Sequence, residues 1–246
     1  MKSIDLNADL GEGFPYDERL LKLVSSCNIA CGGHAGDESS MASTISLAKK
    51  YNVTIGAHPS YPDKGNFGRK MMEISSTHLI TSLTAQINQL LTIGIANNAT
   101  IHYIKPHGAL YNKAMNDKKT ATSIITSVKE INKNLAIMGM PNSELEQLCS
   151  KENIPFIKEG FADRRYTKEG LLVSRNKPNA VLHKNEDVWN QVVKMIQHQE
   201  IDSEEGVPVS IITDSICFHG DTPEALTLLQ FVSKKLNEHS IEITSF

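Results

Sequence analysis

The stretch DLNADLGEG, residues 5–13, decides the fold of this chain. In an extended strand, residues two apart share a face. Asp5, Asn7 and Asp9 therefore lie on one side of the strand, with apolar side chains on the other, and glycines around Glu12 end the run. A strand at a solvated surface has the same alternation. The pattern thus predicts a β-strand with one polar face, and what that face contacts depends on the rest of the chain.

Short apolar runs alternate with longer segments of helical periodicity along the whole chain. The candidate strands are residues 5–9, 27–33, 53–58, 101–107, 135–140, 154–160 and 209–215. Asp221-Thr222-Pro223 is typical of a helix N-cap followed by proline in the first turn. Strand–helix alternation implies parallel strands joined by crossovers. About seven such units predict a TIM-like (β/α) barrel with seven strands, and a doubly wound open sheet is the alternative.

The domain organisation follows from the same pattern. We expect one barrel domain over residues 1–246, because no linker, repeat or low-complexity tract interrupts it. One irregular segment, residues 167–184, contains the runs LLVSR and AVLH. These runs predict a hairpin insertion that covers the mouth of the barrel, where lids usually lie.

Composition excludes several classes of function. The chain of 246 residues is 40% hydrophobic and 22% charged, with a formal net charge of −3 and no Lys/Arg cluster. Nucleic-acid binding and polybasic membrane attachment are therefore not expected. The sequence has neither the pattern of a signal peptide nor an uninterrupted apolar stretch that spans a bilayer. Its four cysteines form no CxxC pair, so a reduced, cytoplasmic protein is expected.

Ionisable side chains gather at the carboxyl ends of the candidate strands. These residues are Asp9, Glu12, His34, His58, Arg69, Lys105, His107, Arg164, Asp214 and His219. A single histidine near a strand end is more often structural than catalytic. The carboxyl ends of parallel strands meet at one edge of the sheet, however, and active sites lie there. The coincidence of so many groups predicts one functional cleft.

Two chemistries fit this set of residues. Neither GxxxxGK[ST] nor GxGxxG is present, so the common backbone cradles for nucleotide phosphates are missing. Asp9, His34 and His58 are candidate ligands of a divalent metal that activates water. Alternatively, carboxylates and imidazoles act as general acid and base without a metal, and Lys105 stabilises an oxyanion. Both chemistries predict attack of water on a carbonyl-type centre.

Several motifs closely resemble the LamB/YcsF family. They are DLNADLGEG, NIACGGHAGD, IGAHPSYPD, FGR, KPHGALYN, FADRRY and DSICFHGDTP, in order along the chain. The resemblance implies a seven-stranded barrel of the glycoside hydrolase/deacetylase type. It also implies ATP-dependent cleavage of 5-oxo-L-proline (pyroglutamate) to L-glutamate, with ATP as co-substrate. The chain would act as the A subunit beside partner subunits B and C.

The resemblance also suggests roles for the motif residues. Asp9, His58, Lys105 and His107 are the expected catalytic residues. The expected substrate-binding residues are Asn7, Glu12, Asn28, His34, Arg69, Arg164, Asp214 and His219. Gly33 stands where the family pattern has phenylalanine, and Ser60 where it has glycine. A metal-dependent deacetylase or amidohydrolase, and a lactam-binding subunit without catalysis, are the alternative functions.

Overall fold

Seven parallel strands close into a barrel in the computed structural model, which describes residues 2–219 and 223–246. The strands are, in barrel order, β1 (Lys2–Leu10), β2 (Ser26–Ala30), β3 (Thr54–His58), β4 (Ile101–Ile104), β5 (Ala136–Gly139), β6 (Phe156–Phe161) and β9 (Ser215–Phe218). The barrel closes because β9 pairs with both β6 and β1. This confirms the predicted seven-stranded, TIM-like fold. The expected N-cap at Asp221 and Thr222 lies outside the described residues.

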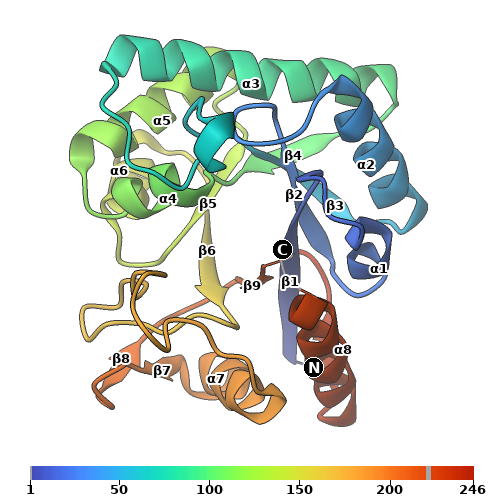
Figure 1. Ribbon diagram of the computed structural model, residues 1–246, viewed down its shortest axis with the longest axis vertical. Coiled ribbons are helices and arrows are strands. Elements are labelled where there is room, and N and C mark those ends of the chain that lie inside the picture. The colour runs from blue at the N-terminus through green and yellow to red at the C-terminus, as the bar shows by residue number, and fades with distance from the viewer. Residues whose placement is uncertain (1, 220–222) are drawn as a thin grey trace.

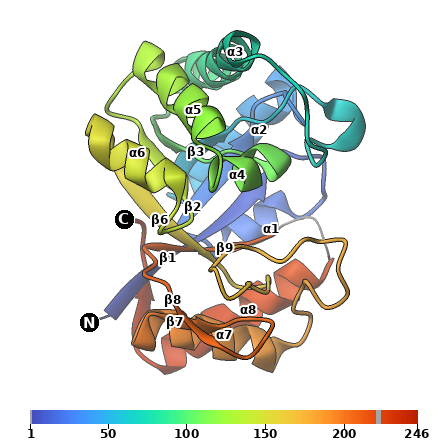
Figure 2. The same cartoon turned by 90° about the vertical axis from the view of Figure 1, so that its left-hand side faces the viewer.

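Helices surround the barrel. They are α1 (Asp17–Leu21), α2 (Glu38–Lys50), α3 (Ser76–Ala96), α4 (Gly108–Ala114), α5 (Lys118–Ile131), α6 (Glu144–Glu152), α7 (Asn185–His198) and α8 (Pro223–Glu238), with a short 3-10 turn at Lys64–Asn66. Figure 1 shows α3 across one side of the barrel, with α7 and α8 on the opposite side. Figure 2 shows the same separation after a quarter turn, with the strands between the two groups. The crossover helices thus cover the outer face of the sheet, as parallel strands require.

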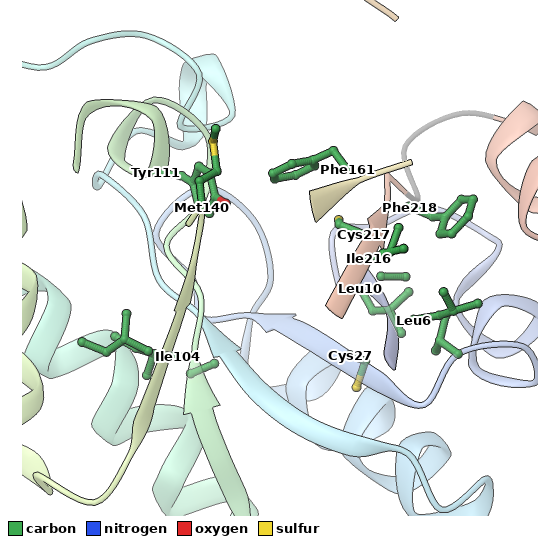
Figure 3. Packing of buried hydrophobic residues seen from close by; sticks show 14 of the residues in the cluster. Leu6, Leu10, Cys27, Ile104, Tyr111, Met140, Phe161, Ile216, Cys217 and Phe218 are labelled. Carbon is green, nitrogen blue, oxygen red and sulfur yellow. The ribbon is translucent and has the colours of Figure 1, made fainter. Parts of the chain in front are cut away.

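The two faces of β1 have opposite surroundings. Leu6, Ala8 and Leu10 are fully buried in the main hydrophobic core between the sheet and the helices, and Figure 3 shows Leu6 and Leu10 among their apolar neighbours. The polar side chains of β1 therefore face the barrel interior. Beyond the barrel, the first residues of β1 pair with the C-terminal strand β10 (Ile241–Ile243).

The seventh barrel strand begins later than the sequence indicates. Residues 209–215 were predicted as this strand, but β9 starts at Ser215. The preceding β8 (Pro208–Ser210) instead pairs antiparallel with β7 (Glu200–Asp202). Burial explains the difference, because Ser215–Phe218 is buried throughout whereas Ile212 is 45% exposed. A barrel strand in a parallel sheet must be buried on both faces.

The segment after β6 folds back over the end of the barrel. The runs LLVSR and AVLH each pair with the residues just after β6: Leu172 bridges to Tyr166, and Val181 bridges to Arg164. Both runs therefore pair with the same segment, residues 164–166. The main-chain bonds Val173 N–H to Arg165 O and Leu182 N–H to Asp163 O complete this arrangement.

Helix α3 is the longest helix in the described part of the chain and contains no charged residue. By length and composition alone it is long and apolar enough to cross a membrane. Its buried side chains include Leu79, Leu83, Ile87 and Leu90, which belong to the main core. One such helix is weak evidence for a membrane span, because a core helix of a soluble protein passes the same test of length and composition.

Candidate active site

The polar face of β1 begins a column of hydrogen bonds through the barrel. The carboxylate of Asp5, at the amino end, accepts hydrogen bonds from the hydroxyls of Ser25 (2.6 Å), Ser26 (2.7 Å) and Ser215. Asp5 is buried, and burial raises its pKa above the ordinary value although the three hydroxyls lower it. This end of the column supports the barrel and lies away from the pocket.

Asn7 and Asn28 form the next layer of the column. Asn7 Nδ2 donates to Ser215 Oγ (2.7 Å) and Glu159 Oε1 (3.1 Å), and Asn7 Oδ1 accepts from Asn28 Nδ2 (2.8 Å). Asn28 Nδ2 also donates to Asp9 Oδ1 at 2.8 Å. Both amides are fully buried and neither lines the pocket. They were predicted to bind substrate, but the structure places them below the pocket, where they orient Asp9.

Lys105 lies at the centre of the column. Its Nζ contacts Asp9 Oδ1 (2.9 Å), Glu159 Oε1 (2.8 Å) and Cys217 Sγ (3.1 Å). Burial alone would lower the pKa of Lys105, but Asp9, Cys217 and Glu159 outweigh it and hold the pKa well above the usual value. An ammonium has three N–H donors, and with Asn7 Oδ1, which lies 3.4 Å from Nζ, four acceptors surround them. Lys105 therefore remains charged and has no donor left for a substrate oxyanion.

Asp9 stands where the column meets the pocket. Its Oδ1 accepts from Lys105 and Asn28, and its Oδ2 lies 3.3 Å from His58 Nε2. Burial would raise the pKa of Asp9, but His58 and Lys105 together hold it well below the ordinary value. Asp9 is therefore a fixed carboxylate at the floor of the pocket.

Next to Asp9 lies a group that we call the imidazole cluster, formed by Glu12, His34, His58 and His107. One ligand atom from each residue lies within 4.8 Å of the others. His34 Nε2 is 2.9 Å from Glu12 Oε1, and the rings of His34 and His107 stack with centroids 3.6 Å apart. Burial lowers the pKa of both His34 and His107, so these rings are neutral near pH 7. Neutral imidazoles are metal ligands.

The tautomers of the cluster follow from its outer hydrogen bonds. A carbonyl oxygen only accepts, so His58 Nδ1–H donates to Lys105 O (2.7 Å) and His107 Nε2–H donates to Phe67 O (3.0 Å). The inner nitrogens, His58 Nε2 and His107 Nδ1, are 3.0 Å apart. In neutral rings both carry lone pairs, which repel at this distance unless a proton or a cation lies beside them. Outer bonds to backbone carbonyls are also typical of histidines that bind metals.

The donor set of the imidazole cluster therefore fits a divalent cation. Three imidazole nitrogens and one carboxylate oxygen converge, which is the ligand chemistry that zinc prefers. Of the ligands predicted from the sequence, His34 and His58 belong to this set. Asp9 lies beside it, in contact with His58, and Glu12 and His107 complete it.

Local backbone geometry brings two loops to the cluster. His58 is the last residue of β3, whereas His107 precedes α4 and is followed by Gly108 with φ of +56°. A Cβ at Gly108 would lie 2.6 Å from Gly68 O. Only glycine allows this close approach, which the bond from Ala109 N–H to Gly68 O maintains. The loop that carries Arg69 is thereby held against the loop that carries His107.

Gly33 and Ser60, two positions that depart from the family pattern, lie against each other. A Cβ at Gly33 would lie 2.5 Å from Ser60 Oγ and 2.3 Å from Gln86 Oε1. Gln86 bonds to both backbone groups of Ser60. The hydroxyl and the amide therefore fill the space into which a side chain at position 33 would extend.

Opposite the cluster, a second acid–imidazole pair lies at the ends of β6 and β9. His219 Nδ1 is 2.9 Å from Asp163 Oδ1, and the imidazole stacks on the ring of Phe161. Figure 3 shows Phe161 at the end of β6 with its ring turned toward Tyr111. His219 was predicted to contribute to the site and lines the pocket.

Arginines also line the pocket. Arg69 and Arg164 were predicted and line it, and Arg175 joins them from the segment after β6. Arg164 donates to Val173 O (2.6 Å), and the guanidinium of Arg69 lies 4.9 Å from the centre of the Phe67 ring. The pocket, of about 510 Å³, is therefore lined by guanidinium groups as well as by carboxylates and imidazoles.

The structure brings together most of the predicted set; Asn7 and Asn28 lie below the pocket, and Asp214 lies away from it. Asp9, Glu12, His58, Arg69, Lys105, His107, Arg164 and His219 line the pocket, and His34 lies behind His107. Asp214 does not join them, because it precedes β9 at the amino end of the barrel, where its carboxylate accepts from Lys158 N–H (2.9 Å). The misplaced seventh strand caused this error.

Sequence reasoning assigned no role in the site to Glu159, Asp163, Cys217 or Arg175. Glu159 and Asp163 share strand parity at the end of the sixth strand, and this signal is visible in the sequence. Cys217 contacts Lys105, and it follows from the correct start of β9. Nothing in the sequence pattern places Arg175.

Comparison with known proteins gives the family. The LamB/YcsF family model matches residues 4–246. The chain belongs to the LamB/YcsF family. A relative in this family, the A subunit of 5-oxoprolinase from Haemophilus influenzae (strain PittEE), is 43% identical over 245 residues, which is all of both chains. The protein of that name from Thermococcus sibiricus is 38% identical over 247 residues, covering 98% of this chain and 97% of its own.

Solved structures agree with this membership. The lactam utilization protein from Thermus thermophilus is 32% identical, covers both chains fully and superposes with a TM-score of 0.93. A family 4 carbohydrate esterase from Streptomyces lividans has a TM-score of 0.50 at 10% identity, covering 98% of this LamB/YcsF chain and 91% of its own. The second likeness concerns the fold alone. The names of the relatives support a role in 5-oxoproline metabolism as one subunit of a larger assembly.

Proposed function

We propose that this chain opens the ring of 5-oxo-L-proline to give L-glutamate, as the A subunit of an ATP-dependent enzyme with B and C subunits in the cytoplasm. The observation that carries the proposal is a single pocket lined both by guanidinium groups and by an acid–imidazole cluster. Relatives named as the A subunit of 5-oxoprolinase, which align over the full length, support the same function.

The substrate has two groups, a carboxylate and a lactam ring, that match these two kinds of lining side chain. Its carboxylate suits the guanidinium groups of Arg69 and Arg164, since arginine binds carboxylates in bidentate geometry. The lactam ring then extends toward Asp9 and the imidazole cluster. A pocket of about 510 Å³ holds this small molecule together with a phosphoryl group and water.

ATP is part of the proposal because a lactam is an unactivated amide. Phosphorylation of the amide oxygen produces a better electrophile, which water then attacks. We assign a share of this activation to the B and C subunits, because this chain lacks the common phosphate-binding motifs. The A subunit then completes the ring opening.

The geometry suggests how this chain's residues act on the activated lactam. Asp9 or His58 accepts the proton of the attacking water, since both reach the floor of the pocket. The imidazole cluster faces the developing negative charge. Lys105, with its donors already used, keeps Asp9 ionised and in place.

The imidazole cluster is also a proposed site for a divalent cation, held by Glu12, His34, His58 and His107. Such a cation supplies a Lewis acid for a carbonyl or phosphoryl oxygen. Metal analysis of protein purified without chelator tests this site independently of activity. We expect bound metal in the wild type and in Glu18→Gln, an exposed control, and none in Glu12→Gln. Equal metal contents in all three proteins would exclude the site.

The decisive assay measures glutamate released from 5-oxoproline, with and without ATP, by this chain alone and with its partner subunits. ATP-dependent release in the assembled complex is the expected result. A folded chain that is inactive under all four conditions would refute the proposal.

Each of the two alternative functions predicts a different experimental result. A metal-dependent deacetylase or amidohydrolase, which the imidazole cluster favours, would need no ATP and would lose activity to a chelator until zinc or manganese is restored. A lactam-binding subunit without catalysis would leave turnover in the complex unchanged by His107→Ala.

A further inference from the structure

Asp163 and His219 form a defined acid–imidazole pair that the roles above do not use. Both carboxylate oxygens of Asp163 lie close to His219 Nδ1, at 2.9 and 3.1 Å. Burial would raise the pKa of Asp163, but His219 and Arg164 hold it below the ordinary value, so Asp163 is a carboxylate near pH 7. A carboxylate only accepts, and Nδ1 of His219 therefore carries the proton that it donates.

This hydrogen bond fixes the direction of the second ring nitrogen. Phe161 stacks on the imidazole with ring centres 5.4 Å apart, which restricts rotation of the ring. His219 lines the pocket, and its Nε2 has no hydrogen-bond partner among the described residues. The side chain is 15% exposed. Nε2 is thus available to a ligand in the pocket.

The order of the strands places this pair across the barrel mouth from the imidazole cluster. His58 ends β3, and His107 follows β4. Asp163 follows β6, and His219 follows β9. In a closed ring of seven strands, the position opposite β3 falls between β6 and β9. A ligand that spans the pocket therefore has the cluster at one end and the pair at the other.

Amide hydrolysis requires catalytic assistance at both atoms of the scissile C–N bond. The carbonyl carbon must receive water, and the nitrogen must receive a proton, because an amide anion is too basic to leave. We infer that His219 is the general acid that protonates the lactam nitrogen and that Asp163 is the residue that positions it. The inference rests on the proposed ring opening and adds the group that makes the amine leave.

The proton balance of the step is complete. As the tetrahedral carbon collapses, the electron pair of the C–N bond passes to nitrogen, and the imidazolium of His219 gives its Nε2 proton to that nitrogen. The carbon keeps the phosphorylated oxygen as an acyl phosphate, which a second water hydrolyses to the free carboxylate of glutamate and inorganic phosphate. His219 becomes neutral and takes a proton back from solvent after the product leaves. Throughout the step Asp163 stabilises the charged ring and holds its tautomer, as a carboxylate does in other acid–imidazole pairs.

The test is a double-mutant cycle on the assembled enzyme, with kcat and KM measured for 5-oxoproline. The variants are His219→Gln, Asp163→Asn and the combination, with His102→Gln, an exposed imidazole on β4, as the matched control. We expect each single variant to lose about 10²–10⁴-fold in kcat with KM unchanged. The double variant should be no slower than the slower single, because the two residues act as one unit. His102→Gln should match the wild type.

Asp163→Glu keeps a carboxylate beside the ring and should recover part of the activity that Asp163→Asn loses. This comparison holds even where His219→Gln folds poorly, which thermal unfolding reports. Wild-type kcat in either single variant, multiplied losses in the double, a change confined to KM, or no recovery with Asp163→Glu would overturn the inference. Absence of glutamate from the wild-type complex would refute the proposed function itself, so the two failures are distinguishable.

Discussion

Lys105→Met removes a buried ammonium from the centre of the barrel, and we predict a large loss of stability. Lys105 is 2% exposed and bridges Asp9 and Glu159 at 2.9 and 2.8 Å. Methionine has a similar length and fills the same volume, so packing changes little. The substitution leaves two buried carboxylates without their shared cation.

The size of the effect follows from burial and distance. Each ion pair is worth about 6 kcal/mol before desolvation at an effective dielectric constant of about 20. Removal of one partner from a buried pair costs about 3–5 kcal/mol, because the remaining charge is uncompensated. Glu159→Gln in the same protein removes one of the two stranded charges. The double variant should therefore be more stable than Lys105→Met alone.

The pH range follows from the shifted pKa values. The folded pKa of Asp9 is below 3.8, so its contribution is present above that pH and is lost as pH falls through the folded pKa. The folded pKa of Lys105 is above 10.5, so its contribution is present below that pH and is lost as pH rises through the folded pKa. The difference between wild type and Lys105→Met should therefore be constant near neutral pH and should shrink in acid.

Urea unfolding measures the prediction. Trp189 is the single tryptophan and is 8% exposed, so its fluorescence reports loss of the fold. Lys50→Met is the matched control: its ion pair with Glu18 has the same 2.8 Å length but lies at the surface, and its unfolding midpoint should equal that of the wild type. The reasoning is refuted if Lys105→Met unfolds at the wild-type midpoint, or if the double variant is less stable than the single.

Further predictions concern buried groups away from the pocket. Since burial raises the folded pKa of Asp5 above 3.8, wild-type stability relative to Asp5→Asn should fall as pH rises from 3.8 through that folded pKa, as urea titrations at several pH values would measure. The four cysteines are free and buried, and burial raises the pKa of Cys31 to about 12, so a thiol reagent should label none of them in the native state and all four in urea. Gly33→Ala should lower the free energy of unfolding by about 1–3 kcal/mol through contact with Ser60 and Gln86, and Ser60→Gly should restore part of it; equal stabilities in thermal melts would contradict this.

The fold could be predicted because two independent signals agree. The apolar residues of β1 alternate with Asp5, Asn7 and Asp9, and the strand–helix order requires parallel crossovers. The seventh strand was misplaced because residues 209–215 have the composition of a strand, although a surface pair of strands uses part of them. Composition does not distinguish a short surface strand from a short barrel strand.

The sequence predicted many of the residues that lie near the site, but not which of them line the pocket and which lie below it. Strand order shows that His58 and His107 reach the same end of the barrel, yet it does not show which residues lie one layer below. Asn7 is two residues before Asp9 on the same face, and it supports the pocket without lining it. The partners of Lys105 come from three strands far apart in sequence, so only the closed barrel reveals that its donors are already used.

The hydrogen bonds of the barrel distinguish the residues that support the pocket from the residues that can react in it. Below the pocket, the carboxylate of Asp5 has three hydroxyl donors, and the ammonium of Lys105 has four acceptors. At the pocket, the inner nitrogens of His58 and His107 are 3.0 Å apart, and lone pairs face each other there unless a proton or a cation lies beside them. A buried conflict of this kind is stable only if surrounding contacts hold it, and such conflicts concentrate at functional sites. The fully bonded layer below therefore holds in place the groups that a cation, a proton or a substrate must complete.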